Sequence, residues 1–460
     1  AREDALLRAL AGEAIQKLGT FQLQGLSMLA WAFARLDLVD AGLVSGVACR
    51  AAGRLTEFRA QELSNLLWAL ARLRVQDVSI FRFAAAAARR DLGRFKPQEL
   101  SNIAWAFGKT EVGDASFLHE LAAAASGQVD RFKPQELSNL CWALADLSSS
   151  DPELLHAIAG RAPGLLGACS VRDLSSLAWS FARAGVREVG LLSFLGREAM
   201  LRIADANPHD LSDLAWSFAK LALGELQVFN AVAAAVPSKV GLFEPEELSN
   251  ILWAFGKVSF HDDQLLRAVV REALPRLGTF KTVELSNAAA ALAKLGVEDV
   301  DFLQSVAQEA KPRLAEFKPL DLAYLAWAFA SLGLCSKELF RAIAQEATSR
   351  LVEFNPQGLS DLLWSFATLD LAEGSLFAAA ADRLWRELKV LQADGPGALG
   401  LTELGTSVRR LVWALSFVGH LSDDLLAAAR RALQHAAAIA DAGVPSLAPL
   451  ALGDGMAGRR

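Results

Sequence analysis

Short polar side chains recur along this chain at a constant interval of 37 residues. The amide row, as we call these positions, consists of Met28, Asn65, Asn102, Asn139, Ser176, Asp213, Asn250, Asn287, Tyr324 and Asp361. An amide both donates and accepts hydrogen bonds, whereas an ionised Asp only accepts. All members except Met28 are therefore candidates to bind the edge of a nucleobase, and Asp would favour a base that offers an amino or imino proton.

A second row lies seven residues after each amide-row position and is mostly basic. The cation row, as we call its basic members, consists of Arg35, Arg72, Lys109, Arg183, Lys220, Lys257 and Lys294. The other three positions hold Asp146, Ser331 and Thr368. Because Lys and Arg bind phosphate, the two rows together have the chemistry to hold RNA at one base per repeat.

A Trp lies three residues after the amide-row position in nine of the ten repeats. This Trp row consists of Trp31, Trp68, Trp105, Trp142, Trp179, Trp216, Trp253, Trp327 and Trp364, with Ala290 in the tenth place. A constant period of this length indicates a stacked array in which each repeat buries its apolar face against its neighbours.

The stretch FKPQELSNIAWAF, residues 95–107, indicates what each repeat is. Pro97 suits the first position of a helix, and Glu99 lies in the first turn, where the helix dipole favours an acid. The pattern predicts one helix over residues 97–109 and a second, rich in Ala and Leu, over 114–126. The predicted fold is all-α, a right-handed α-solenoid of about eleven such repeats.

The ends of the chain depart from this pattern. Residues 4–21 align without gaps to residues 263–280, so the chain opens on the second helix of a repeat. Either this half-repeat is a cap, or an upstream part of the chain is not included. The predicted segments are α-solenoid repeats over 1–390 with the half-repeat at 1–20 and ten regular repeats from 21, an inserted Gly-rich loop at 391–407, a terminal helical hairpin at 408–442 and a loose tail at 443–460.

A helical wheel places Leu100, Ile103, Ala104 and Phe107 on one apolar face, which must meet the second helix. Small residues follow each Trp at the next position and at the third, so the first helices of successive repeats can approach closely. The amide row, the cation row and a row rich in Gln seven residues before each Trp share the remaining polar arc.

Each row also has a structural interpretation. The Asn side chains could form a hydrogen-bond ladder between repeats, and a Lys or Arg in the last turn is favoured by the helix dipole whatever the ligand. The Trp side chains could pack over the small residues of a neighbouring repeat or stack on bases. Ala290 then marks either a packing gap or a skipped base.

Several classes of function have little support. The net charge of -6 gives no global attraction to nucleic acid, so binding would depend on local patterning. No apolar run approaches the roughly 18 residues of a membrane span. The four cysteines and six histidines show no metal-binding spacing, and no catalytic motif is present. We therefore expect no enzyme activity, no cofactor, no metal and no small-molecule substrate.

The repeat core is written out in LSNLLWALARL, Leu63–Leu73, and LSNILWAFGKV, Leu248–Val258. These stretches resemble octotricopeptide and heptatricopeptide repeat proteins, which are related to the repeat region of RAP-domain and FAST-kinase-like proteins, and the resemblance covers residues 1–440. It implies a protein of mitochondria or plastids that binds RNA in stabilisation, processing, translation or ribosome assembly. The C-terminal part continues as helices, so the RAP domain that often follows such repeats is not expected.

The leading hypothesis is a non-catalytic adaptor that grips about ten nucleotides of single-stranded RNA, if one base is read per repeat. The second is an architectural subunit of a mitochondrial ribosome or another organellar ribonucleoprotein, which would hold rRNA and contact other ribonucleoprotein subunits. The third is a scaffold that binds proteins in its groove.

Overall fold

The computed structural model describes residues 2–75, 77, 79–165, 167, 169–394 and 401–443. Within these ranges the chain consists of α-helices joined by turns and short 3-10 helices, without a strand. Neighbouring helices contact one another along the chain, and this confirms the predicted all-α solenoid of repeats. The chain divides into two compact units, Ala1–Val269 and Val270–Arg460.

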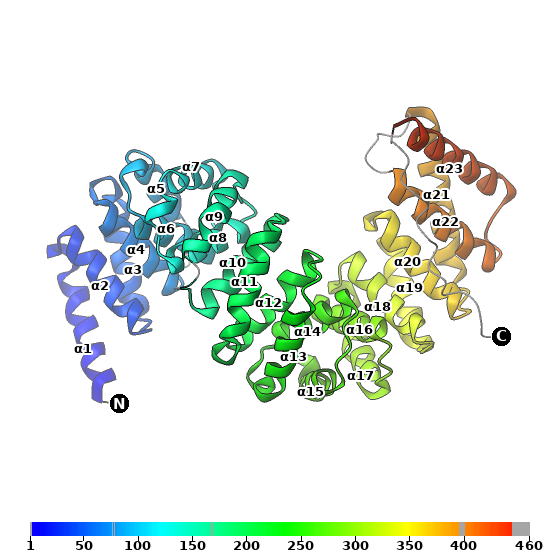
Figure 1. Cartoon of the computed structure of the whole chain (residues 1–460), viewed down its shortest axis with the longest axis horizontal. Helices are drawn as coiled ribbons and strands as arrows, with labels where there is room; N and C mark the ends of the chain where they lie inside the picture. The colour runs from blue at the N-terminus through cyan, green and yellow to red at the C-terminus, as the bar shows by residue number, and fades with distance from the viewer. Residues whose placement is uncertain are drawn as a thin grey trace. The chain divides into compact units, whose positions relative to one another are not determined.

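Each repeat contributes one first helix and one second helix, which alternate along the chain (Figure 1). The first helices are α2 (Leu23–Arg35), α4 (Ala60–Arg72), α6 (Pro97–Thr110), α8 (Pro134–Asp146), α10 (Val171–Ala184), α12 (Pro208–Lys220), α14 (Pro245–Val258), α16 (Thr282–Leu295), α18 (Pro319–Ser331), α20 (Pro356–Thr368) and α22 (Leu401–Phe417). The second helices are α1 (Arg2–Lys17), α3 (Ala41–Ala52), α5 (Ser79–Ala88), α7 (Ala115–Ser126), α9 (Pro152–Leu165), α11 (Val189–Leu201), α13 (Leu226–Ala235), α15 (Asp263–Ala273), α17 (Val300–Ala310), α19 (Lys337–Ser349), α21 (Gly374–Asp394) and α23 (Asp423–Gly443).

The start of α6 follows the predicted chemistry. Pro97 is its first residue, and the Glu99 carboxylate accepts a hydrogen bond from the Lys96 backbone N–H at 2.8 Å. This bond satisfies a backbone donor that the helix itself leaves without a partner. The predicted core face is confirmed, since Leu100 and Phe107 are fully buried.

The first helices end in a left-handed residue that recurs every 37 positions. These residues, all with positive φ, are Asp37, Arg74, Glu111, Ser148, Gly185, Ala222, Ser259, Gly296, Gly333 and Asp370. In α6, the N–H of Glu111 donates to the carbonyl of Gly108, and the N–H of Val112 donates to that of Phe107. This pair of bonds is a Schellman motif, which satisfies carbonyls at the helix end. Seven of the ten positions are not Gly, and each of those costs roughly 1 kcal/mol of backbone strain.

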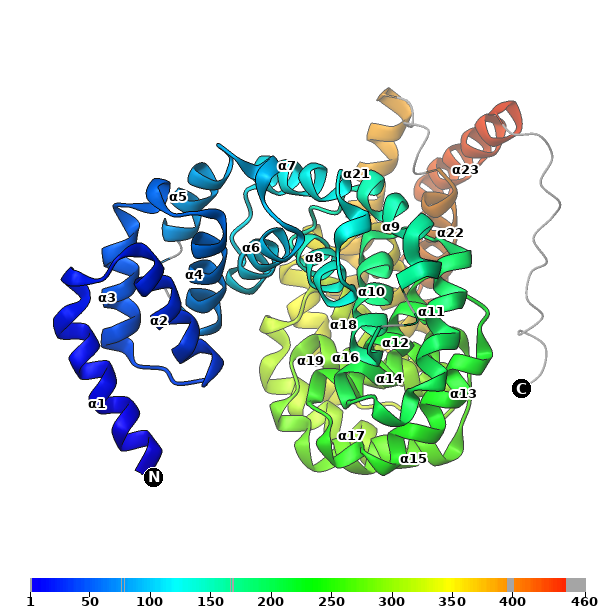
Figure 2. The same cartoon turned by 60° about the vertical axis from the view of Figure 1, so that its left-hand side comes forward.

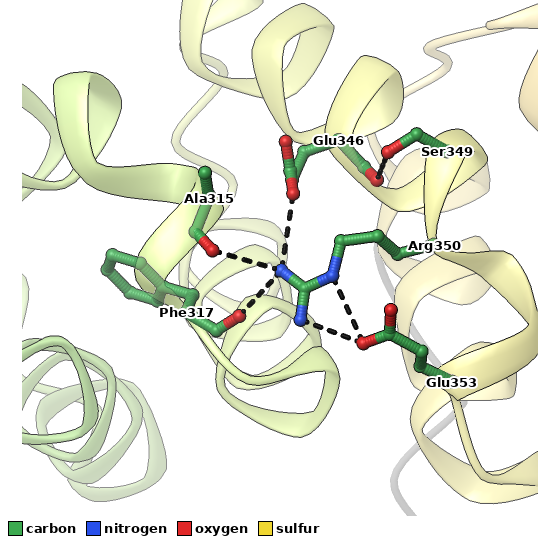
Figure 3. A network of polar contacts seen from close by, with 6 residues as sticks. All are labelled: Ala315, Phe317, Glu346, Ser349, Arg350 and Glu353. Carbon is green, nitrogen blue, oxygen red and sulfur yellow. Dashed lines mark hydrogen bonds and ion pairs between the residues drawn. The ribbon is translucent and has the colours of Figure 1, made fainter.

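A long polar side chain near the end of many second helices bonds to the turn that joins its repeat to the preceding one. In Figure 3, Arg350 donates to the carbonyl oxygens of Ala315 and Phe317 at 3.3 and 2.9 Å, while Glu346 and Glu353 hold its guanidinium group. Comparable bonds to the turn before a first helix come from Arg50, Gln128, Arg161, Arg202, Lys239, Arg313 and Arg383. We call these contacts junction bonds.

The C-terminal segments differ in part from the prediction. The loop expected over residues 391–407 is shorter at both ends, because α21 continues to Asp394 and α22 begins at Leu401. Residues 395–400 lie outside the described ranges, as does the predicted tail beyond Gly443. The final helix begins at Asp423. None of the described helices combines the length and apolar character that a membrane crossing requires.

Candidate nucleic-acid interface

The first helices pack against one another more extensively than the second helices do, in each unit. In each unit we call the surface that they form the first-helix wall; it consists of α2 to α14 in the first unit and of α16 to α22 in the second. Equivalent residues of neighbouring helices lie side by side: the ring centroids of Trp68 and Trp105 are 5.8 Å apart, and those of Trp179 and Trp216 are 6.2 Å apart. The rows identified in the sequence are therefore continuous over neighbouring helices of the wall.

The five Asn side chains of the amide row have a common environment. Asn65, Asn102, Asn139, Asn250 and Asn287 are all half-buried. Among the described residues, none of their side-chain amides has a hydrogen-bond partner. The hydrogen-bond ladder that was the structural alternative for these residues is therefore not formed by their amides. A half-exposed amide without a partner keeps both its donor and its acceptor available for a ligand.

Two hydrogen bonds between repeats do exist, one residue earlier, on α8 and α10. Ser138 Oγ donates to the Asp173 carboxylate of the next repeat at 3.0 Å, and Ser175 Oγ donates to Asp210 at 3.3 Å. All four side chains are buried. The sequence contains the signal, since Ser recurs beside the amide row and an acid recurs in the first turn, but their pairing across 35 residues was not foreseen.

The acidic members of the amide row are placed differently from the Asn residues. Asp213 and Asp361 are buried, at 8% and 7% exposure, and burial raises the pKa of both carboxyl groups. Asp213 lies 3.6 Å from His209 Nδ1, and Asp361 is paired with the guanidinium group of Arg410 on α22. Their carboxylates are thus engaged within the protein.

Ser176 and Tyr324 complete the amide row, and both are half-buried. Burial is the main cause that raises the pKa of the Tyr324 phenol, with Asp361 and Asp321 adding to it. A raised pKa keeps the phenol protonated, so its hydroxyl can donate a hydrogen bond at neutral pH.

All seven members of the cation row are exposed. Three of them lie over rings of the Trp row: Arg35 over Trp31, Arg72 over Trp68, and Lys109 over Trp142. Such cation–π contacts hold the cations close to the wall without removing their charge. Lys220 and Lys257 have no partner among the described residues.

Asp146 takes the place of a cation in the cation row, and its surroundings show that equivalent positions of neighbouring repeats lie close together. Burial raises the pKa of its carboxyl group, and the charges of Lys109 and Arg183, one repeat before and one after, oppose that shift. The three side chains therefore lie near one another on α6, α8 and α10.

The Trp row packs as the structural interpretation predicts. Trp142 lies against Gly108 of the preceding repeat, where a Cβ atom would come within 2.9 Å of the indole Cζ3 atom. The small residue three positions after each Trp is thus needed for close approach of the helices. Trp142 and Trp105 remain half-buried and not fully enclosed, so part of each ring stays accessible at the wall.

Charge is distributed unevenly along the first unit. Residues 50–109 contain eleven Lys and Arg residues against five Asp and Glu residues, whereas residues 201–250 contain three against seven. In the acidic stretch, Asp210, Glu246 and Glu247 add to the burial that raises the pKa of Asp213. Phosphate groups would therefore be attracted more strongly to the second and third repeats than to α12 and the start of α14.

The described residues do not bring together a group of three or more His, Cys, Asp or Glu side chains that could hold a metal ion. Cys141 and Cys169 are buried, and burial raises the pKa of both thiols to about 12. Thiols with so high a pKa stay protonated and unreactive at neutral pH. Cys49 and Cys335 are exposed.

Two family models match parts of the chain. The model of RNA-editing substrate-binding complex 6 protein matches residues 225–441, and the model of the N-terminal domain of the Tbc2 translation factor matches residues 34–191. The chain is thus similar to RNA-related helical repeat proteins over both units. No curated protein sequence matches the chain.

Two solved structures match the chain at low similarity. One is a homology model of the full-length AP-3 complex in an intermediate open conformation, with 11% identity and a TM-score of 0.34 over 90% of this chain and 89% of that chain. Another is a circular tandem repeat protein with novel repeat topology, with 13% identity and a TM-score of 0.18 over 94% and 99%. TM-scores this low carry no weight for fold or function.

Proposed function

We propose that this chain is a non-catalytic RNA-binding repeat protein that acts in the stabilisation, processing or translation of RNA, including roles on the ribosome. The observation that carries the proposal is the row of half-exposed Asn amides without partners beside a row of exposed cations on the same wall. The family models named for RNA editing and translation support an RNA-related role. A location in the mitochondrion or plastid belongs to the proposal because the repeat core resembles organellar repeat proteins.

The two rows would bind different parts of a single strand. On a helix with a rise of 1.5 Å per residue, seven residues separate the amide from the cation by roughly 10 Å. That separation allows a base edge to meet the amide while its phosphate meets the cation. Because an amide can donate and accept at once, each Asn can form paired hydrogen bonds with one base edge.

Reading is expected to be strongest in the second to fourth repeats. Asn65, Asn102 and Asn139 stand next to one another on α4, α6 and α8, within or beside the basic part of the first unit. Asp213 and Asp361 are engaged with His209 and Arg410, so fewer than ten bases would be read through the amide row.

The test is selection of RNA from a randomised pool by the purified chain, followed by affinity measurements on the selected sequence. A variant with Asn65, Asn102 and Asn139 changed to Ala should bind the selected and scrambled sequences alike. The matched control changes three exposed amides of second helices, Asn230, Gln304 and Gln308, to Ala and should keep the preference. A wild-type protein that selects no sequence, or a triple variant that retains the preference, would refute base reading.

A second candidate, a structural subunit of a ribonucleoprotein, is favoured by several exposed apolar side chains at the start of the first unit. Leu10, Met28, Trp31, Leu36 and Val39 are each between 44% and 66% exposed there. Exposed apolar side chains in one part of a protein are typical of protein–protein contacts. This candidate predicts that the free chain binds RNA without sequence preference and that crosslinking inside the organelle captures a protein at this surface.

A further inference from the structure

The second unit contains the one regular repeat in which the Trp row is interrupted. Ala290 on α16 takes the place of the Trp and is half-buried. Helix α16 packs directly against α18, whose Trp327 is the next member of the Trp row (Figure 2). In the first unit, Trp105 and Trp216 each have the Trp ring of the preceding repeat beside them. Trp327 has no ring partner among the described residues. Ala290 offers only a methyl group at the equivalent position of α16.

The surface around Ala290 also differs in polarity from the rest of the wall. Seven residues before the Trp position, five repeats carry Gln, but α16 and α18 carry Val283 and Leu320. Both are exposed, at 40% and 37%. Tyr324, the only tyrosine of the chain, stands in the amide row of α18. Two neighbouring first helices thus present an apolar and aromatic surface where the other repeats are polar.

One free amide belongs to this surface. Asn287 lies one helical turn before Ala290 and is half-buried, and its side chain has no hydrogen-bond partner among the described residues. Lys294 lies one turn after Ala290 and is exposed. Asn287 and Lys294 therefore flank Ala290 on α16, and Trp327 holds the equivalent position on the neighbouring α18.

We propose, on the basis of the RNA-binding function above, that the surface around Ala290 is a stacking slot for one unpaired nucleobase. The base takes the space that the missing indole leaves and stacks on Trp327, while its edge bonds to the Asn287 amide. Tyr324 and the exposed Val283 and Leu320 border the slot. The first unit then reads base edges, whereas this part of the second unit holds a base mainly by its face.

The chemistry of the slot favours a base over an apolar side chain of a protein partner. A base has a flat π-face for Trp327 and paired donors and acceptors on its edge for Asn287, and an aliphatic side chain would leave the amide without a bond. A purine is favoured over a pyrimidine because its larger ring system covers more of the indole.

The test is the variant Ala290→Trp, which restores the residue that the other regular repeats hold and fills the slot. Because the variant loses the stacking contribution of one base to the free energy of RNA binding, its RNA affinity should fall about five-fold or more. The midpoint of its thermal unfolding should stay the same or rise. If Ala290 only marks a packing gap, the variant would gain stability and bind RNA like the wild type, and the proposal would be overturned.

A second pair of variants gives an independent readout. Trp327→Leu should lose RNA affinity at least about five-fold, whereas Trp364→Leu, a matched loss in the same row of the same unit, should change it by less than about two-fold. Photocrosslinking of bound RNA that contains a photoreactive purine should label α18. Equal effects of the two Leu variants would overturn the slot. A wild-type protein that binds no RNA would instead refute the proposed function itself.

Discussion

Changing Lys109, Lys220 and Lys257 to Gln should weaken RNA binding and, above all, its dependence on salt. The three side chains are exposed members of the cation row on α6, α12 and α14. They are preferred to Arg72, which also donates to the carbonyl oxygen of Ala34 at 2.9 Å and thus contributes to folding. The change removes phosphate contacts while leaving the amide row untouched.

The expected magnitude follows from counterion release. Each phosphate contact on a single strand contributes about 0.7 to the slope of log affinity against log salt. Loss of three contacts should therefore reduce the slope by about 2. Between 50 and 200 mM salt, the wild-type affinity should fall about 20-fold more than that of the variant.

The assay is fluorescence anisotropy of a labelled RNA titrated at four or more salt concentrations. The matched control changes Arg59, Lys96 and Lys133 to Gln, since these are exposed cations at the N-terminal ends of α4, α6 and α8 and carry the same total charge. The control should keep most of the wild-type slope. If both variants lose slope equally, binding depends on net charge and the cation row has no special role; if only the control loses it, the phosphates lie at the other edge of the wall.

Three further predictions concern stability, measured by urea unfolding. Arg350→Ala should lower the free energy of unfolding by about 2 kcal/mol because it leaves two carbonyl groups without their donor. The control Arg341→Ala, on the exposed side of α19, should change the free energy of unfolding by less than about 0.5 kcal/mol. Gly108→Leu should cost about 1 to 3 kcal/mol because a side chain there meets Trp142, and a neutral result would mean that the wall is loosely packed. Burial raises the folded-state pKa of Asp213, so the stability from its bound proton is present at acid pH and is lost as pH rises through that pKa. Asp213→Asn should therefore stabilise the protein more at pH 8 than at pH 5, and the opposite trend would contradict a raised pKa.

Periodic side chains made the fold predictable, because burial of an apolar face depends on spacing within one helix. Leu100 and Phe107 were assigned to the core from the helical wheel and are fully buried. The junction bonds were missed, since Arg350 donates to backbone carbonyls of Ala315 and Phe317, and a carbonyl has no signal in the sequence.

The candidate site was predictable as a set of positions but not as a set of partners. The amide row could be placed on one arc of the first helices from its spacing alone. Whether a member is free depends on the neighbouring helix: the Asn102 amide has no partner among the described residues, whereas Asp361 is paired with Arg410. The chain between α20 and α22 is twelve residues longer than the repeat period, so the pairing of Asp361 with Arg410 could not be recognised from the 37-residue interval.

The left-handed ends of the first helices bear on how such a chain can evolve. Seven of them hold residues such as Ala222 and Glu111, for which this conformation is strained, while Gly adopts it freely. For Ala, Asp, Glu and Arg, one nucleotide change in the codon yields Gly. The turns are far apart, so gains of about 1 kcal/mol at each should add. Thermal adaptation of this architecture could therefore proceed by single mutations that leave every ligand-facing position unchanged.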